Sequence, residues 1–261
     1  MEREDRLSRL IDFVIDEGSV HVEKVMERFD VSAATARRDL DSLAAQQLII
    51  RTRGGAMVNS SSGDLPLRYR TVHRWREKAS IARKVADLIS PGDVVAFNGG
   101  TTTTSAAQEL GVRVAGDARF DDTLTTVVTN AVNIANDLMV RTQLRIVVTG
   151  GVAQGRSYEL IGPLASLMLP HICIDTLFLG ISALDLEHGL FTHHEGEAAV
   201  NAEMAAMARR TVVLADSSKI GTTAFARICR LEEVEVLVTD SGVKDSAVTA
   251  LEASGVTLII A

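Results

Sequence analysis

Two short stretches of the sequence carry groups that could hold an anion. NGGTTTTS, residues 98–105, follows the apolar run VVAF, and DSSK, residues 216–219, follows VVLA and ends in Lys219. Glycine permits close approach of a ligand to the backbone, and the N–H groups at a helix start favour negative charge. A threonine run can also simply cap a helix, but Lys219 could supply the countercharge of a phosphate. These residues predict an anion site.

Other ligand classes find less support. The loop lacks the GK[ST] of a P-loop and the third glycine of GxGxxG, which disfavours ATP and dinucleotides. His193, His194 and Glu195 are adjacent, and neighbouring histidines on a strand do not easily reach one ion. Cys173 and Cys229 lie far apart in apolar sequence, so we expect buried thiols and neither a disulfide nor a zinc site. We therefore predict no metal and no cofactor.

From residue 77 onward, helical and strand-like patterns alternate. The helix EKASIARKVADLIS precedes VVAFN, NAVNIANDLM precedes LRIVVTG, GEAAVNAEMAAMARR precedes TVVLAD, a segment near LEEVE precedes VLVTD, and a last helix precedes VTLIIA. A further helix is expected to begin near Ser105, after the threonines. Continuous valine and isoleucine runs indicate strands buried on both faces. The pattern predicts a doubly wound, mostly parallel α/β domain.

In such a sheet, ligands bind at the carboxyl ends of the strands. Small or polar residues follow five of the expected strands, at positions 98–103, 129–130, 150–151, 180 and 216–219. We expect these loops to form the binding site.

The first 58 residues have a different pattern. Apolar residues at helical spacing predict a helix over about residues 5–17, followed by the helix VEKVMERF. Ser32 can cap a third helix, AATARRDLDSLAAQ, in which Ala36, Leu40 and Leu43 must face inward. This leaves Ala34, Thr35, Arg37, Arg38 and Asp41 on its outer face.

This arrangement fits DNA. A helix, a tight turn and a second helix bearing arginines match the major groove, where Arg can bind guanine and Thr can reach a phosphate or a thymine methyl. LIIRTRGGAMV predicts a hairpin whose Arg51 and Arg53 could lie along the phosphates as a wing. The alternative is a helical bundle whose arginine pair is merely solvated. The candidate DNA contacts are Ser32, Ala34, Thr35, Arg37, Arg38, Arg51 and Arg53.

A polar, proline-terminated stretch, NSSSGDLP, separates the two patterns. We expect a DNA-binding domain over 1–58, a linker over 59–76 and an α/β domain over 77–261. Basic residues between Arg68 and Arg76 could touch flanking DNA, although a solvated connecting helix is the simpler interpretation. The net charge is +1 over residues 1–78 and −8 over 79–261, and DNA affinity follows local phosphate contacts instead of the total.

The composition predicts a soluble, cytoplasmic protein. Apolar residues make up 46% of the 261-residue chain, yet no stretch approaches the ~18 uncharged apolar residues of a membrane span. The start, MEREDRLSRLIDF, is charged and amphipathic, unlike a secretory signal.

The stretch VSAATARRDLDSLAAQQLIIRTRGGA resembles the signature of the DeoR family of bacterial transcription regulators, in which VS, T, RRDL, L and R-x-x-GGA recur at this spacing. It departs from the family at Ala36, usually a branched residue, and at Gln47, commonly glycine. Neither departure removes a candidate DNA contact. Arg70 and Glu77-Lys78 also match residues that the family carries before its next helix.

Further along, GTTT, TN, GG, the EA of GEAAV and DSSK occur in the order of the DeoR effector domain, which is similar in fold to ribose-5-phosphate isomerase. The resemblance implies a phosphate cradle at Gly100, Thr101, Thr102 and Thr103, which follow Asn98 in the same loop. It implies a sugar bordered by Thr129, Asn130, Gly150, Glu197, Asp216 and Lys219. Gly99 stands where the family often has serine, and residues 111–126 lengthen a connection.

We therefore expect a repressor of a carbohydrate-catabolism operon, with double-stranded operator DNA and a phosphorylated sugar as partners. Dimers or tetramers are expected because one recognition helix reads few base pairs. The alternative is an isomerase-like enzyme with an appended DNA-binding domain, in which Glu197, Asp216 or Lys219 would be the acid or base. An attached DNA-binding domain makes sensing the simpler role, so the prediction is a regulator and not an enzyme.

Overall fold

The computed structural model describes residues 3–45, 48–58 and 74–261. The chain forms two compact units, Met1–His73 and Arg74–Ala261, each of which is considered by itself. Of the expected linker, residues 59–73 lie outside the described residues, as does most of the basic stretch. Residues 74–76 belong to the second unit.

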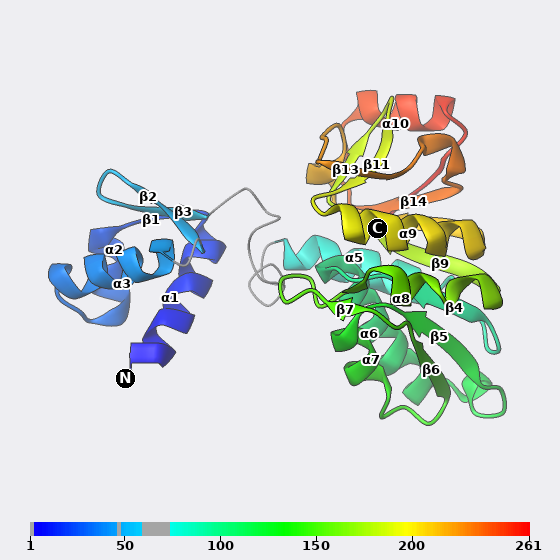
Figure 1. Cartoon of the computed structure of the whole chain (residues 1–261). Helices are drawn as coiled ribbons and strands as arrows, with labels where there is room; N and C mark the ends of the chain where they lie inside the picture. Colours follow the sequence, from blue (N-terminus) through cyan, green and yellow to red (C-terminus); the bar gives the residue numbers. More distant parts are fainter. Residues whose placement is uncertain (1–2, 46–47, 59–73) are drawn as a thin grey trace. The chain divides into compact units, whose positions relative to one another are not determined.

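The first unit is a winged helix-turn-helix (Figure 1). Its core is formed by the apolar faces of the helices, including Leu10, Val14, Leu40 and Leu43. Gly54, with a φ of 88°, lies in the hairpin turn, and a short first strand that the sequence pattern did not reveal completes an antiparallel sheet in the order β1-β3-β2. Its elements are α1 (Arg3–Glu17), β1 (Ser19–His21), α2 (Val22–Phe29), α3 (Ala33–Ala45), β2 (Ile49–Thr52) and β3 (Gly55–Val58).

The second unit is built on a seven-stranded sheet in the order β15-β14-β12-β9-β4-β5-β6. Every pair of neighbours in it is parallel, which confirms the doubly wound α/β fold. The strands are β4 (Val94–Phe97), β5 (Thr125–Thr129), β6 (Leu144–Val148), β9 (Ile174–Gly180), β12 (Ala208–Leu214), β14 (Val236–Thr239) and β15 (Thr257–Ile260).

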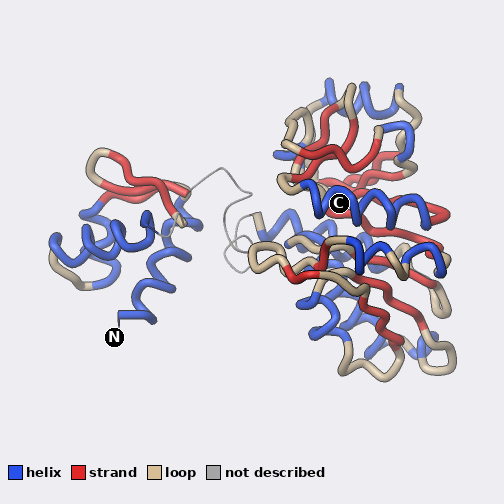
Figure 2. The backbone as a smooth tube through the Cα atoms, viewed as in Figure 1, coloured by secondary structure: helices blue, strands red, loops and turns tan. Residues whose placement is uncertain are grey.

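Helices and smaller elements flank this sheet (Figure 2). The helices are α5 (Trp75–Ala86), α6 (Thr101–Gly116), α7 (Val132–Leu138), α8 (Pro163–Ser166), α9 (Glu195–Met207) and α10 (Asp245–Ala253). The smaller strands are β7 (Val152–Ala153), β8 (Leu160–Ile161), β10 (Ala183–Asp185), β11 (Gly189–Thr192) and β13 (Ala226–Cys229). The 3-10 turns are η1 (Ala118–Phe120), η2 (Leu169–His171), η3 (Ser217–Lys219) and η4 (Leu231–Glu233).

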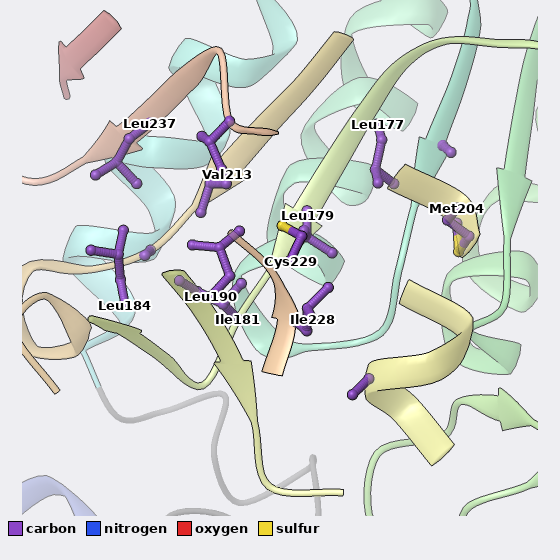
Figure 3. Packing of buried hydrophobic residues seen from close by; sticks show 14 of the residues in the cluster. Leu177, Leu179, Ile181, Leu184, Leu190, Met204, Val213, Ile228, Cys229 and Leu237 are labelled. Carbon is purple, nitrogen blue, oxygen red and sulfur yellow. The ribbon is translucent and has the colours of Figure 1, made fainter. Parts of the chain in front are cut away.

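The inner strands are buried on both faces, and successive residues serve two different cores. Leu177 and Leu179 of β9 pack with Met204 of α9 in one core, part of which Figure 3 shows. Phe178, between them, joins the other core and stacks on Phe97 of β4 with 5.1 Å between ring centroids. This explains why the strands read as continuous apolar runs.

The structure differs from the sequence pattern at several element ends. The helix expected from Ser105 begins at Thr101, so the threonines form its first turn. The expected helix over residues 196–210 ends at Met207, and the strand β12 begins with the next residue. The segment near LEEVE is the short turn η4. The two small antiparallel sheets, β7-β8 and β10-β11-β13, had no clear signal in the sequence.

The strand order places the topological switch point between β4 and β9. After β4 the chain adds β5 and β6 on one side, and it then returns to add β9, β12, β14 and β15 on the other. Ligands of open α/β sheets bind beyond the carboxyl ends of strands at such a point. These ends are Phe97 in β4 and Gly180 in β9.

Candidate functional site

The loop after β4 is shaped by Gly100, whose φ of 138° places it in a region that L side chains rarely adopt. Its carbonyl oxygen accepts the Thr104 N–H at 2.9 Å and the Thr104 hydroxyl at 2.7 Å. The Thr103 hydroxyl donates to the same oxygen at 3.0 Å. These back-bonds give two hydroxyls a partner inside a helix start made of residues with modest helix propensity.

The start of α6 leaves backbone N–H groups that a ligand could bind. Intrahelical bonding begins at Thr104, and the N–H groups that precede it in a first turn have no partner within the helix. Thr102 is 2% exposed, and its hydroxyl has no hydrogen-bond partner among the described residues. The groups of the threonine run that a ligand could bind are thus backbone amides and the buried Thr102 hydroxyl. The hydroxyls of Thr103 and Thr104 are instead bonded to the Gly100 carbonyl.

Asn98 links the carboxyl ends of β4 and β9 at the switch point. Its side-chain amide donates to the Gly180 carbonyl at 2.9 Å and its Oδ1 accepts the Gly180 N–H at 2.7 Å. The residue is 1% exposed. Because both polar atoms of the side chain are used, Asn98 positions the loop.

Lys219 lies beside this point. Its Nζ donates to the carbonyl of Ile181, directly after β9, at 2.5 Å. The two residues belong to segments 38 positions apart in the sequence. The structure therefore brings Lys219 to the carboxyl end of β9, where Gly180 in turn contacts Asn98.

Asp216 is surrounded by cations. Burial alone would raise its pKa, but the charges of Lys219, Arg74 and Lys78 and a hydrogen bond from Ser218 outweigh that effect, so the pKa lies below its ordinary value of 3.8. Arg74 Nη1 lies 3.3 Å from Asp216 Oδ1, and Arg74 Nε lies 3.4 Å from Glu77 Oε1. The side chain of Asp216 is therefore a charged anchor for basic groups.

Sequence reasoning missed two of these cations. Arg74 lay within the expected linker, and Lys78 was noted only as part of a family pattern. Lys78 lies in the first turns of α5 and is 4% exposed. The apolar spacing of this helix places position 78 on the inward face. A lysine at an inward position was the signal that could have identified Lys78.

Other predicted effector residues lie at neighbouring strand ends. The Thr129 hydroxyl is used internally, since it donates to the Phe97 carbonyl at 2.7 Å and accepts the Ala131 N–H at 3.0 Å. Asn130 is fully buried, and its Oδ1 lacks a partner in the described parts of the chain. Gly150 lies against α8, where a Cβ would come within 2.8 Å of the Leu164 carbonyl oxygen.

Glu197 belongs to the first turn of α9 and accepts the Thr192 hydroxyl at 2.9 Å. Thr192 also lies 3.5 Å from the hydroxyl of Ser182, which follows Ile181 in the chain. His194 caps α9 through Nδ1, which accepts the Gly196 N–H at 3.0 Å. This gives His194 a structural role, and over residues 3–45, 48–58 and 74–261 no group of three or more His, Cys, Asp or Glu could hold a metal ion.

Glu159 is a further acidic residue that the sequence did not single out. It precedes β8, is 2% exposed, and accepts the Gly99 N–H through Oε1 at 2.7 Å. No sequence motif surrounds Glu159, so the sequence carries no signal of its contact with Gly99.

The candidate DNA-binding face is formed by α3 and the wing. Ala34, Arg37 and Arg38 are exposed, whereas Thr35 is half-buried. The Ser32 hydroxyl accepts the Thr35 N–H at 3.2 Å and lies 3.0 Å from the Thr35 hydroxyl, so Ser32 caps the helix and Thr35 contacts the cap.

The arginines of this face differ in their partners. Arg51 Nε donates to Asp41 of α3 at 2.8 Å, and its Nη1 donates to the Gly55 carbonyl. Arg51 thus joins the wing to the recognition helix, while Arg53 is exposed at the hairpin turn. The aspartate of RRDL, Asp39, is buried and pairs with Arg6 at 2.7 Å.

Residues 6–62 match the DeoR-like helix-turn-helix domain, and residues 73–241 match the DeoR C-terminal sensor domain. The chain is 33% identical to the HTH-type transcriptional repressor GlcR of Bacillus subtilis, covering 100% of this chain and 97% of that one. It is 32% identical to the glycerol-3-phosphate regulon repressor of Escherichia coli, covering 92% of both. These relatives are named as regulators, which favours sensing over catalysis.

Solved structures show partial likeness in fold. A ribose-5-phosphate isomerase in complex with phospho-erythronic acid is 16% identical with a TM-score of 0.41, over 55% of this chain and 52% of that one. The probable sor operon regulator of Shigella flexneri is 15% identical with a TM-score of 0.40, over 68% of this chain and 89% of that one.

Within the described residues, no helix is long and apolar enough to span a bilayer. By the two domain matches and the full-length relatives, the chain belongs to the DeoR family of DNA-binding transcriptional regulators.

Proposed function

We propose that this regulator represses a carbohydrate-catabolism operon and that a phosphorylated sugar or sugar derivative changes its affinity for the operator. The observation that carries the proposal is the meeting, at the switch point of the sheet, of a helix start with Lys219. The amides of α6 and the ammonium group are fixed to the ends of β4 and β9 through Gly100, Asn98 and the Ile181 carbonyl. Both kinds of donor favour a phosphate.

The sugar would lie beyond the phosphate, among polar groups at the neighbouring strand ends. Asn130 presents a buried amide oxygen without a partner in the described residues, which a sugar hydroxyl could satisfy. Glu197 and Asp216 supply carboxylate acceptors for further hydroxyls. The basic groups Arg74 and Lys78, beside Asp216, add positive charge on this side.

At the operator, Arg37 and Arg38 would read base edges in the major groove from the exposed face of α3. Arg53 would contact a phosphate from the wing. Arg51 supports these contacts by fixing the wing to Asp41. A symmetric dimer or tetramer would present two such faces to two half-sites.

A titration of operator binding tests this function. Fluorescence anisotropy of a labelled promoter fragment would be measured with and without each of a panel of sugar phosphates and the matching unphosphorylated sugars. At least one phosphorylated compound should change the dissociation constant severalfold, because an effector acts through its differential affinity for two states. If none does, the sensor function is wrong. Turnover of a sugar phosphate by the full chain would favour the isomerase-like alternative.

A further inference from the structure

Glu159 is a buried carboxylate held against the loop that carries the proposed phosphate site. Its Oε1 accepts the Gly99 N–H at 2.7 Å, and its own carbonyl accepts the Gln154 N–H at 2.8 Å. The next residue, Leu160, donates its N–H to the Asn130 carbonyl at 2.6 Å. Glu159 is therefore fixed both to the loop after β4 and to the chain leading into β8.

Gly99 and Glu159 depend on one another. A Cβ at position 99 would lie 2.2 Å from Cγ and 2.8 Å from Cδ of Glu159. The serine that the family often carries at this position would collide with the carboxylate arm. Glycine at 99 is therefore what admits Glu159 to the loop in this chain.

A phosphate at the start of α6 would bind amides next to the one that this carboxylate occupies. Gly99 immediately precedes Gly100, the N-cap of α6, so the amide that Glu159 occupies adjoins the amides expected to bind the ligand. The buried hydroxyl of Thr102, which has no hydrogen-bond partner among the described residues, marks where a ligand oxygen would complete the turn. A carboxylate and a phosphate bound to adjoining amides would repel each other strongly, because charges inside a protein are poorly screened.

We infer that Glu159 is an intrinsic competitor of the effector phosphate. This inference rests on the sensor function proposed above. Without effector, Glu159 satisfies the Gly99 amide and holds the loop; the phosphate binds when Glu159 leaves it. Because Glu159 runs directly into β8, its departure changes the β7–β8 hairpin, so the two states differ in structure as well as in charge. Glu159 therefore lowers the affinity of the site for phosphate, and its movement makes the β7–β8 hairpin the segment that responds to the effector.

The test compares phosphate binding by three forms of the full chain, using inorganic phosphate as the probe and isothermal titration calorimetry at pH 7.5. Glu159→Gln keeps the size of the side chain and an oxygen acceptor for the Gly99 N–H, but it removes the charge. Glu252→Gln, an exposed position on α10, is the matched control. We expect Glu159→Gln to bind phosphate about tenfold tighter than the unmodified chain, equivalent to about 1.4 kcal/mol, and Glu252→Gln to bind it within about twofold of the unmodified chain.

Amide exchange of the unmodified chain gives a second readout that needs no variant. Phosphate should speed exchange at Leu160, whose N–H donates to the Asn130 carbonyl and depends on the hairpin that Glu159 leads into. Slower or unchanged exchange at Leu160 would overturn the inference, as would equal or weaker phosphate binding by a folded Glu159→Gln. In either case, a sugar phosphate that still shifts operator binding would leave the sensor function standing. If neither phosphate nor any sugar phosphate binds, both are wrong.

Discussion

Replacing Lys219 by methionine removes one charge at the switch point while keeping most of the length of the side chain. The ammonium group is held at the end of β9 by its 2.5 Å bond to the Ile181 carbonyl. Two unit charges 4 Å apart interact by about 4 kcal/mol at an effective dielectric constant of 20. Lys219 is half-buried, and its charge also interacts with Asp216. We therefore expect its interaction with the ligand to contribute about half of this energy. A loss of about 2 kcal/mol corresponds to about 30-fold weaker effector binding.

The assay is anisotropy of a labelled operator at increasing concentrations of an active sugar phosphate. The midpoint of the response should move about 30-fold upward in Lys219→Met, while operator affinity without the sugar stays the same. Lys244→Met, an exposed lysine before α10, loses the same charge and should keep the original midpoint. An unshifted midpoint in Lys219→Met, with a normal unfolding temperature, would show that the ammonium group does not contact the effector.

Three further changes probe other parts of the chain. Arg38→Ala should weaken operator binding by about 1–3 kcal/mol in anisotropy measurements and leave the sugar-phosphate stabilisation in thermal unfolding unchanged; loss of both would indicate misfolding. Gly99→Ser should lower the unfolding temperature through its collision with Glu159, and adding Glu159→Ala should restore much of it; no recovery would contradict their mutual dependence. Asp216 has a lowered pKa, so its contribution is present above the unfolded value near 3.8 and is lost as the pH falls through the folded pKa. Denaturant titrations below pH 4 should thus show a shallower acid dependence in Asp216→Asn, and an unchanged dependence would exclude this role.

The element types were largely predictable because the fold repeats simple patterns. Helical spacing identified α2 from Val22 to Phe29, and continuous apolar runs identified the parallel strands. The start of α6 was misplaced because threonine has a modest helix propensity. The hydroxyls of Thr103 and Thr104 bond to the Gly100 carbonyl only once the turn has formed, so propensity does not include these contacts.

Within the candidate sites, side-chain direction was less predictable than residue position. Asn98, Thr129 and Arg51 were selected as possible contacts, but each is engaged by the protein itself. Glu159 was missed because its partner, Gly99, is 60 residues away. Contacts across such separations depend on the strand order, which a single sequence does not show.

The pairing of Asn98 with Gly180 limits how this sensor can respond. Because the two strands at the switch point are clasped at their ends and stacked through Phe97 and Phe178, separating them would cost both hydrogen bonds and aromatic packing. We therefore expect the sheet to keep its structure when the ligand binds. A signal from the ligand must travel through the covering segments, such as the β7–β8 hairpin, and a mutation that abolishes the response without abolishing binding is expected there instead of in the strands.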